Sequence, residues 1–158
     1  MAYQRLQVTR ALKVHKTTTD IDIPDPDFAG ISGTSATSGT SKLTVAAANT
    51  FTADTVQTGF IVENVSTGTY ARVTAIDSGT QLSLSNNIFT AAGDTYQIYS
   101  QSTRGCILYV GGTGNLKVIT AAGDEVTYVD IQKGTFLPIQ VIRIVTSGTT
   151  AADFIAHW

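Results

Sequence analysis

The stretch GCILYVGGTGNLKVITAAGDEVTYVDI (105–131) is the clearest indication of the fold class of this chain. It holds three apolar runs, CILYVG, NLKVIT and EVTYVDI, which are rich in Val, Ile, Leu and Tyr, the residues that favour strands. The segments between the runs, GGTGN and TAAGD, carry the residues that tight turns require. This stretch therefore predicts consecutive β-strands joined by hairpin turns.

The same pattern extends along the rest of the chain, while no window keeps apolar residues at the spacing of an amphipathic helix. Short apolar runs separated by Ser, Thr, Gly and Asp clusters are typical of sandwiches and barrels. The sequence predicts an all-β protein with strands at 59–65, 69–76, 81–85, 94–100, 106–111, 115–120, 125–131, 136–146 and 153–158. Pro138 falls inside one of these runs and predicts an edge or a bulge there.

Three regions can be distinguished along the chain. Residues 1–38 read as an extended N-terminal arm and linker, because Pro24 and Pro26 restrict the backbone and remove two amide donors. Residues 39–101 alternate apolar and polar positions and predict a small β-barrel-like module. Residues 102–158 have longer apolar runs and predict a β-sandwich-like module. TAAGD occurs at 90–94 and again at 120–124, which we interpret as similar turn chemistry rather than as a duplication.

Composition favours contact with protein over contact with nucleic acid or lipid. Charged residues make up 14% of the chain, against roughly 25% in an average domain, so much of the surface must be Thr, Ser, Gly, Asn and Gln. The net charge is −2 and no basic cluster is visible, which argues against nucleic acid as a partner. The first thirty residues hold no apolar core of signal-peptide length and no run spans a membrane, so we expect cytoplasmic synthesis and no membrane partner.

The residues that carry chemistry do not form a recognisable catalytic pattern. Cys106 lies in an apolar run, and the only histidines, His15 and His157, stand near opposite ends of the chain. A triad of Cys106, His157 and Asp153 lacks a nucleophile elbow. Most of the carboxylates available for glycoside hydrolysis lie at turn positions, where Asp caps or bends the backbone. We therefore expect neither enzymatic activity nor a cofactor.

A metal site is the alternative reading of the acidic run Asp20, Asp22, Asp25 and Asp27. Alternating carboxylates suit calcium, but Pro24 interrupts the run and neither the turn glycine nor the closing glutamate of a calcium loop is present. We expect a solvated arm and no metal, although the sequence does not decide whether a metal ion binds the arm.

Several segments resemble virion structural proteins of tailed phages, particularly marine and cyanobacterial phages. The resemblance lies in GTFLPIQV (134–141), GTTA (148–151) and a terminal aromatic residue, Trp158, and it extends to the stretches 59–99 and 10–26. Such proteins often end in Ala-Leu-Trp, whereas this chain ends in Ala-His-Trp. The resemblance implies a structural role in the virion without catalytic residues, and it does not fix which part of the virion is involved.

The functional expectation is a capsid decoration or cement protein that forms a homotrimer and binds the major capsid protein or other virion proteins between capsid subunits. The alternatives are a neck, tail or fibre-base component, or a carbohydrate-binding module with Tyr70 and Tyr99 as its platform. The arm would add a strand to a partner, and a terminal tryptophan would close the second module's core or insert into a neighbour. The candidate partner-binding residues are Arg10, Leu12, Val14, Ile21, Ile23, Pro24, Pro26, Phe28 and Trp158.

Overall fold

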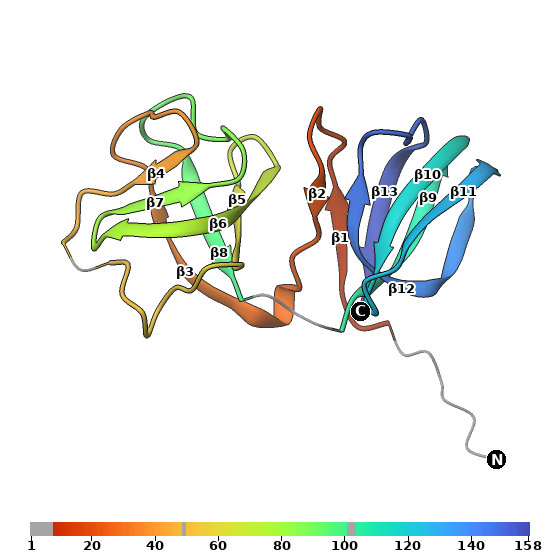
Figure 1. Ribbon diagram of the computed structural model, residues 1–158, viewed down its shortest axis with the longest axis horizontal. Helices are drawn as coiled ribbons and strands as arrows, with labels where there is room; N and C mark the ends of the chain where they lie inside the picture. Colours follow the sequence, from red (N-terminus) through yellow and green to blue (C-terminus); the bar gives the residue numbers. More distant parts are fainter. Residues whose placement is uncertain (1–7, 49, 101–103) are drawn as a thin grey trace, which may run out of the picture.

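All nine strands predicted between residues 59 and 158 are present in the computed structural model (Figure 1). The structure describes residues 8–48, 50–100 and 104–158. Within these ranges the regular elements are strands, apart from one short 3-10 helix, and the strands form two antiparallel sheets. The all-β class is therefore confirmed.

The C-terminal module is built on a seven-stranded sheet in the order β1-β13-β9-β12-β10-β11, with β2 paired to β12 beside that path. The long strand β12 pairs with β9 through its first part and with both β10 and β2 through its last part. The strands of this sheet are β1 (Ala11–Val14), β2 (Ile21–Asp22), β9 (Cys106–Gly112), β10 (Gly114–Thr120), β11 (Glu125–Ile131), β12 (Thr135–Val145) and β13 (Ala152–His157).

The core of this module follows from the two-residue period of its strands. In β9 the side chains of Cys106, Leu108 and Val110 are buried, whereas Ile107 and Tyr109 between them are partly exposed. Successive side chains of a strand point to opposite faces, so one apolar row lines the core and the other lies outside. The inner rows of all the strands meet in one cluster that also contains Phe154.

The N-terminal module holds a six-stranded sheet in the order β3-β8-β5-β6-β7-β4. Its own core gathers around Phe51, Phe89 and Tyr96, with Leu43 and Leu82 fully buried. The strands are β3 (Ala29–Thr34), β4 (Lys42–Thr44), β5 (Ile61–Asn64), β6 (Thr69–Ser78), β7 (Gln81–Leu84) and β8 (Thr95–Tyr99).

The two TAAGD segments make different connections in spite of their identical sequence. At 120–124 the segment closes the β10–β11 hairpin, where the Thr120 amide donates to the Asp124 carbonyl at 2.9 Å. At 90–94 it leads into β8, whose neighbours are β3 and β5. Gly93 and Gly123 have positive φ angles of 85° and 95°, which glycine adopts without strain. The shared motif thus reflects shared turn chemistry.

The expected extended arm over residues 1–38 needs correction within the described residues. β1 pairs with β13 and β2 pairs with β12, while β3 belongs to the other sheet. Val14, Ile21 and Ile23 are 2%, 1% and 6% exposed in the core of the C-terminal module. The physical reason is that these apolar side chains find partners in strands more than a hundred residues away. Met1 to Gln7 lie outside the described residues.

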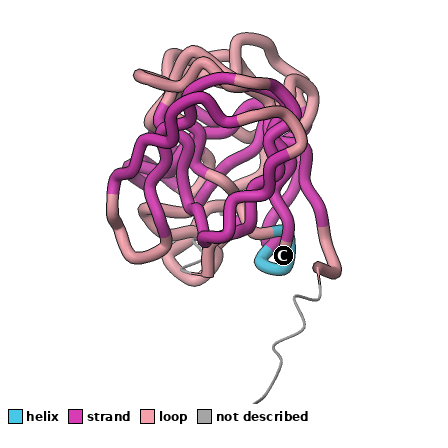
Figure 2. Tube along the Cα trace, turned by 90° about the vertical axis from the view of Figure 1, so that its right-hand side faces the viewer, coloured by secondary structure: helices cyan, strands magenta, loops and turns pink. Residues whose placement is uncertain are grey.

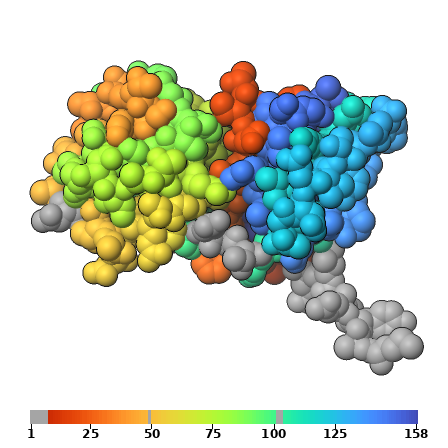
Figure 3. Space-filling model, in the orientation of Figure 1, coloured from red at the N-terminus to blue at the C-terminus, as the bar shows by residue number. Residues whose placement is uncertain are grey.

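The segment around β2 joins the two modules. Figure 3 shows the red N-terminal residues in the seam between the green and the blue halves of the molecule. Ile61 and Tyr70, on the outer face of the N-terminal sheet, are buried in the same cluster as Ile21. Asp22 accepts hydrogen bonds from Arg72 of β6 and from Arg143 of β12, the latter at 2.7 Å. Apolar burial and ion pairing thus act together at the junction.

Candidate protein-binding surface

The outer face of the C-terminal sheet carries apolar side chains from three neighbouring strands. Tyr109 of β9 stands opposite Phe136 of β12 and Ile155 of β13, and Ile107 stands opposite His157. Residues directly opposite one another in an antiparallel pair share a face of the sheet. We call Ile107, Tyr109, Phe136, Ile155 and His157 the outer aromatic face.

The rings of this face contact one another, and one of them, Phe136, is exposed to solvent. The ring centroids of Tyr109 and Phe136 are 5.1 Å apart, and those of Phe136 and His157 are 5.5 Å apart, both in tilted arrangements. Phe136 is 56% exposed. An exposed aromatic side chain packed against further rings makes this face the candidate binding surface of the chain.

Phe136 lies on the outer side of β12, where an irregularity in the pairing follows it. The pairing of β12 with β9 shifts register between Phe136 and Gln140, and Pro138 lies within that interval. The bulge predicted at Pro138 is therefore confirmed. Leu137 points into the core and is 2% exposed, which leaves the neighbouring Phe136 on the solvent side.

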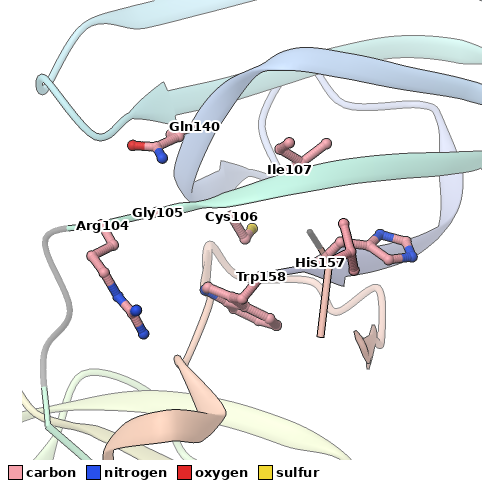
Figure 4. Close-up of a pocket in the computed structure, with 8 residues that line it drawn as sticks. Arg104, Gly105, Cys106, Ile107, Gln140, His157 and Trp158 are labelled. Atoms are coloured by element: carbon pink, nitrogen blue, oxygen red, sulfur yellow. The ribbon is translucent and has the colours of Figure 1, made fainter. Parts of the chain in front are cut away.

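A shallow pocket of about 160 Å³ continues the outer aromatic face at the end of the sheet. Ile107 and His157 belong to both the face and the pocket. Figure 4 shows the Trp158 ring beneath the strand that carries Cys106 and Ile107. The remaining lining comes from Val8, Arg104 and Gln140 among others. Val8 is 41% exposed, so the apolar surface extends past the pocket.

Trp158 closes the core of its own module. It packs against the C-terminal core while one side of it lines the pocket. Backbone hydrogen bonds fix its position: the Trp158 amide donates to the Arg10 carbonyl at 3.0 Å, and the Arg10 amide donates to the Trp158 carbonyl at 3.2 Å. Of the two roles expected for this residue, the structure supports core closure.

The other residues predicted to bind a partner mostly serve the chain's own fold. Leu12 is half-buried against the core, and Pro24 is buried. Pro26 begins the 3-10 helix η1 (Pro26–Phe28), which Asp25 caps by accepting from the Asp27 amide. Val14, Ile21 and Ile23 lie in the core, as described above. The prediction of these residues as a docking arm is therefore corrected.

Two of the predicted residues remain at the surface. Arg10 pairs with Asp27 at 3.0 Å and donates to the Pro26 carbonyl at 2.9 Å. Phe28 is 42% exposed and lies under the Arg104 guanidinium, 5.0 Å from the ring centroid. Arg10 precedes β1, whereas Phe28 lies on the segment that leads into the N-terminal module.

The acidic run forms ion pairs with arginines. Asp25 is 1% exposed and binds Arg104 at 2.6 Å, and Asp27 contacts Arg104 at 3.3 Å. The carboxylate of Asp20 accepts from the Thr146 amide at 3.0 Å. In the described part of the chain, no three side chains among His, Cys, Asp and Glu are grouped as ligands for a metal ion.

The structure does not support a carbohydrate platform of Tyr70 and Tyr99. The two residues are 3% and 8% exposed, and both hydroxyls donate to the Glu63 carboxylate, at 3.4 Å and 2.6 Å. Burial is the main cause that raises the pKa of each phenol, and the nearby Glu63 carboxylate adds to it. Rings held in this way cannot stack on a sugar, so this alternative is wrong for these two residues.

Cys106 is a buried core side chain. Its Sγ donates to the Val141 carbonyl at 3.3 Å, and burial raises the pKa of the thiol, with a smaller contribution from Asp25. The reactive form of cysteine is the thiolate, which this environment disfavours.

Sequence reasoning missed the outer aromatic face as a site. The alternation in CILYV indicated that Ile107 and Tyr109 share a face, but it did not indicate which face is inside. The exposure of Phe136 follows from the alternation of β12, in which Leu137 faces the core.

The fold and this surface define a two-module all-β chain with an exposed aromatic face. No protein-family model matches the chain, and a search of curated proteins finds no match. Within the described residues, no helix has the length and apolar character needed to cross a membrane.

Proposed function

We propose that this chain is a non-enzymatic structural protein of a tailed-phage virion, and that it decorates the head by binding between subunits of the major capsid protein. The observation that carries the proposal is the exposed Phe136, held against Tyr109 and His157 on the outer aromatic face. Large aromatic side chains in well-packed surroundings are the residues that dominate the energetics of protein interfaces.

The junction between the modules also suits a cement role. Ile61 and Tyr70 are buried against the C-terminal core, and Asp22 bridges arginines from both modules. A protein that holds two capsid subunits together must transmit force between its own contacts. Two modules joined by burial and ion pairs do this better than two modules on a flexible linker.

The resemblance to virion structural proteins is the reason why the proposed partner is a phage capsid. GTFLPIQV (134–141) contains Phe136 and the bulge around Pro138, and Trp158 closes the core beside the pocket. Residues that carry the resemblance and residues of the outer aromatic face thus belong to the same strands. The role proposed for residues 8–28 changes accordingly, from docking arm to part of the fold.

The test is binding to phage heads that lack this protein. Phe136→Ser should weaken binding about 30-fold, which corresponds to about 2 kcal/mol, because a central aromatic anchor is lost. The matched control is Val65→Ser, which removes another exposed apolar side chain (49% exposed) from the N-terminal module. Co-sedimentation with the heads measures both variants. Equal binding by Phe136→Ser and the native protein would contradict the proposed contact surface.

A further inference from the structure

The C-terminal sheet ends in two different strands, and neither has a second neighbour among the described residues. β1 is the first strand of the sheet and β11 is the last. In Figure 2 the strand that follows the grey N-terminal trace, β1, runs along one margin of the molecule. Figure 1 places β11 at the end of the molecule remote from the N-terminal module. Open strand edges can pair with another chain.

The backbone groups of β1 alternate between its partner β13 and the open edge. Arg10 exchanges hydrogen bonds with Trp158, so its amide and carbonyl face β13. Because these groups alternate along a strand, those of Ala11 and Lys13 face the open edge. The side chains of Ala11 and Lys13 are exposed, whereas Leu12 and Val14 pack toward the core.

The open edge of β11 has the same organisation. The Thr120 amide donates to the Asp124 carbonyl, so the backbone carbonyl of Asp124 faces β10. By alternation, the backbone groups of Glu125, Thr127 and Val129 face outward. These three side chains are exposed, and Val129 is 68% exposed. Tyr128, between them, packs against the core.

The two edges carry opposite charge. Residues 11–16 contain two lysines and no acidic residue, whereas residues 124–131 contain three acidic residues and no basic one. Like edges would therefore repel one another, which disfavours a two-fold pairing of β1 with β1 or of β11 with β11. Unlike edges attract, and opposite charges directly across an antiparallel pair stabilise it.

We propose that copies of this chain associate head to tail, with β11 of one copy added in antiparallel fashion to β1 of the next, and with Lys13 opposite Glu125. This register places Ala11 opposite Thr127. The exposed side chains of Ala11 and Lys13 then lie beside the exposed Thr127 and Glu125, and Leu12 lies beside Val126 on the core-facing side. Glu125, which already contacts Lys117 at 2.6 Å, lies between two lysines.

The partner is thus a second copy of the same chain, and the contact is heterologous. A head-to-tail contact generates a ring if its rotation closes and a filament if it does not. A homotrimer is one such ring. This inference rests on the proposed structural role and names the surface through which copies join, namely the two strand edges of the sheet that carries the outer aromatic face.

Disulfide trapping between two single variants tests the register. Lys13→Cys and Glu125→Cys, prepared with tags of different size, are mixed and oxidised. Hydrogen-bonded antiparallel partners have Cα atoms about 5.5 Å apart, within the range that a disulfide spans. We expect disulfide-linked heterodimers on a non-reducing gel. The only native cysteine, Cys106, is 2% exposed and does not compete.

The matched control replaces Glu125→Cys with Lys133→Cys, which is also exposed but lies beyond the end of β11. A mixture of Lys13→Cys with Lys133→Cys should give no more heterodimer than either variant gives homodimer. Homodimers in place of heterodimers in the first mixture, or equal yields in the two mixtures, would overturn the proposal.

Charge reversal tests the attraction without a new covalent bond. Lys13→Glu and Glu125→Lys should each lower the mass observed by light scattering at a fixed concentration, and the double variant should restore it. Lys13 and Glu125 are both exposed, so we expect the variants to retain the fold. A double variant no better associated than either single variant would overturn the pairing. Association in solution without binding to heads would instead contradict the virion role and leave the edge contact intact.

Discussion

Asp22 forms ion pairs with one arginine from each module. Its side chain is 9% exposed, and its Oδ1 accepts from Arg72 and from Arg143, whose side chains are 30% and 25% exposed. The Nε of Arg72 is buried without a hydrogen-bond partner among the described residues. Loss of the Asp22 carboxylate would leave a second nitrogen of this guanidinium without a hydrogen bond, which lowers the stability of the fold.

Asp22→Asn should lower the free energy of unfolding by about 2 kcal/mol, because two partly buried arginines lose their shared carboxylate. Denaturant unfolding measures this change. Asp77→Asn is the matched control: its partner Lys42, at 2.8 Å, is a more exposed surface contact, and the expected loss is under about 1 kcal/mol. Equal losses for the two variants would contradict a special role for Asp22.

Glu63 holds two buried tyrosines on the face of the N-terminal sheet that carries Ile61 and Tyr70. Burial, together with the Glu63 carboxylate, raises the pKa of both Tyr70 and Tyr99 above the ordinary value of 10.0. The folded chain therefore keeps protons that the unfolded chain releases. The stability linked to these phenols is fully present below pH 10 and is lost as the pH rises above it.

Unfolding experiments between about pH 9 and pH 11 should show a decreasing free energy of unfolding. Tyr99→Phe should make this decrease shallower, because one of the titrating phenols is gone. Its stability at neutral pH should also be lower, since the 2.6 Å hydrogen bond to Glu63 is lost. A pH profile as steep as that of the native protein would show that Tyr99 does not contribute.

At the scale of elements, β1 and β2 are short strands with large structural effects. β1 has four residues and β2 has two, and together with Ile23 they contribute three buried aliphatic side chains to the C-terminal core. β2 also contacts β6 of the other module. Removal of this segment would open one core and the junction at the same time.

Ile21→Ala should destabilise the protein by about 3 kcal/mol, because Ile21 is 1% exposed and its removal leaves a cavity. Val65→Ala, at an exposed position of the N-terminal module, should cost under about 0.5 kcal/mol. The midpoints of chemical denaturation measure both. An Ile21→Ala variant as stable as the native chain would favour a detached arm over the packed strand.

The strands after residue 59 could be predicted because their signal is local. Alternation and turn residues located β11 at 125–131, where the structure has it, and the neighbouring strands to within two residues at either end. β1 and β2 could not be assigned to a sheet in this way. Their partners, such as His157 for Ala11 and Arg143 for Asp22, are far away in sequence.

The candidate site was harder to predict than the fold for a related reason. Leu137 and Phe136 are adjacent apolar residues, and only the packing of β12 in the sheet decides which of them faces the core. The sequence offers Trp158 as a candidate partner-binding residue, yet in the structure its ring packs against the core. Exposure of an aromatic ring is a property of tertiary packing, and local sequence carries only an indirect signal for it.

At the scale of the whole molecule, two different surfaces of the chain are proposed to make contacts. The outer aromatic face is proposed to bind capsid subunits, and the charged edges β1 and β11 are proposed to join copies of the chain. Both belong to the C-terminal module, while the N-terminal module is fixed to it through Asp22, Ile61 and Tyr70. Such an arrangement lets one copy bind the particle and its neighbours at the same time.

The most direct test of the virion role is to label intact phage particles with antibody against this chain and to image them by electron microscopy. The proposal predicts label distributed over the head. Label confined to the neck or tail would keep a structural role but contradict decoration of the head, and particles without label would contradict a place in the virion.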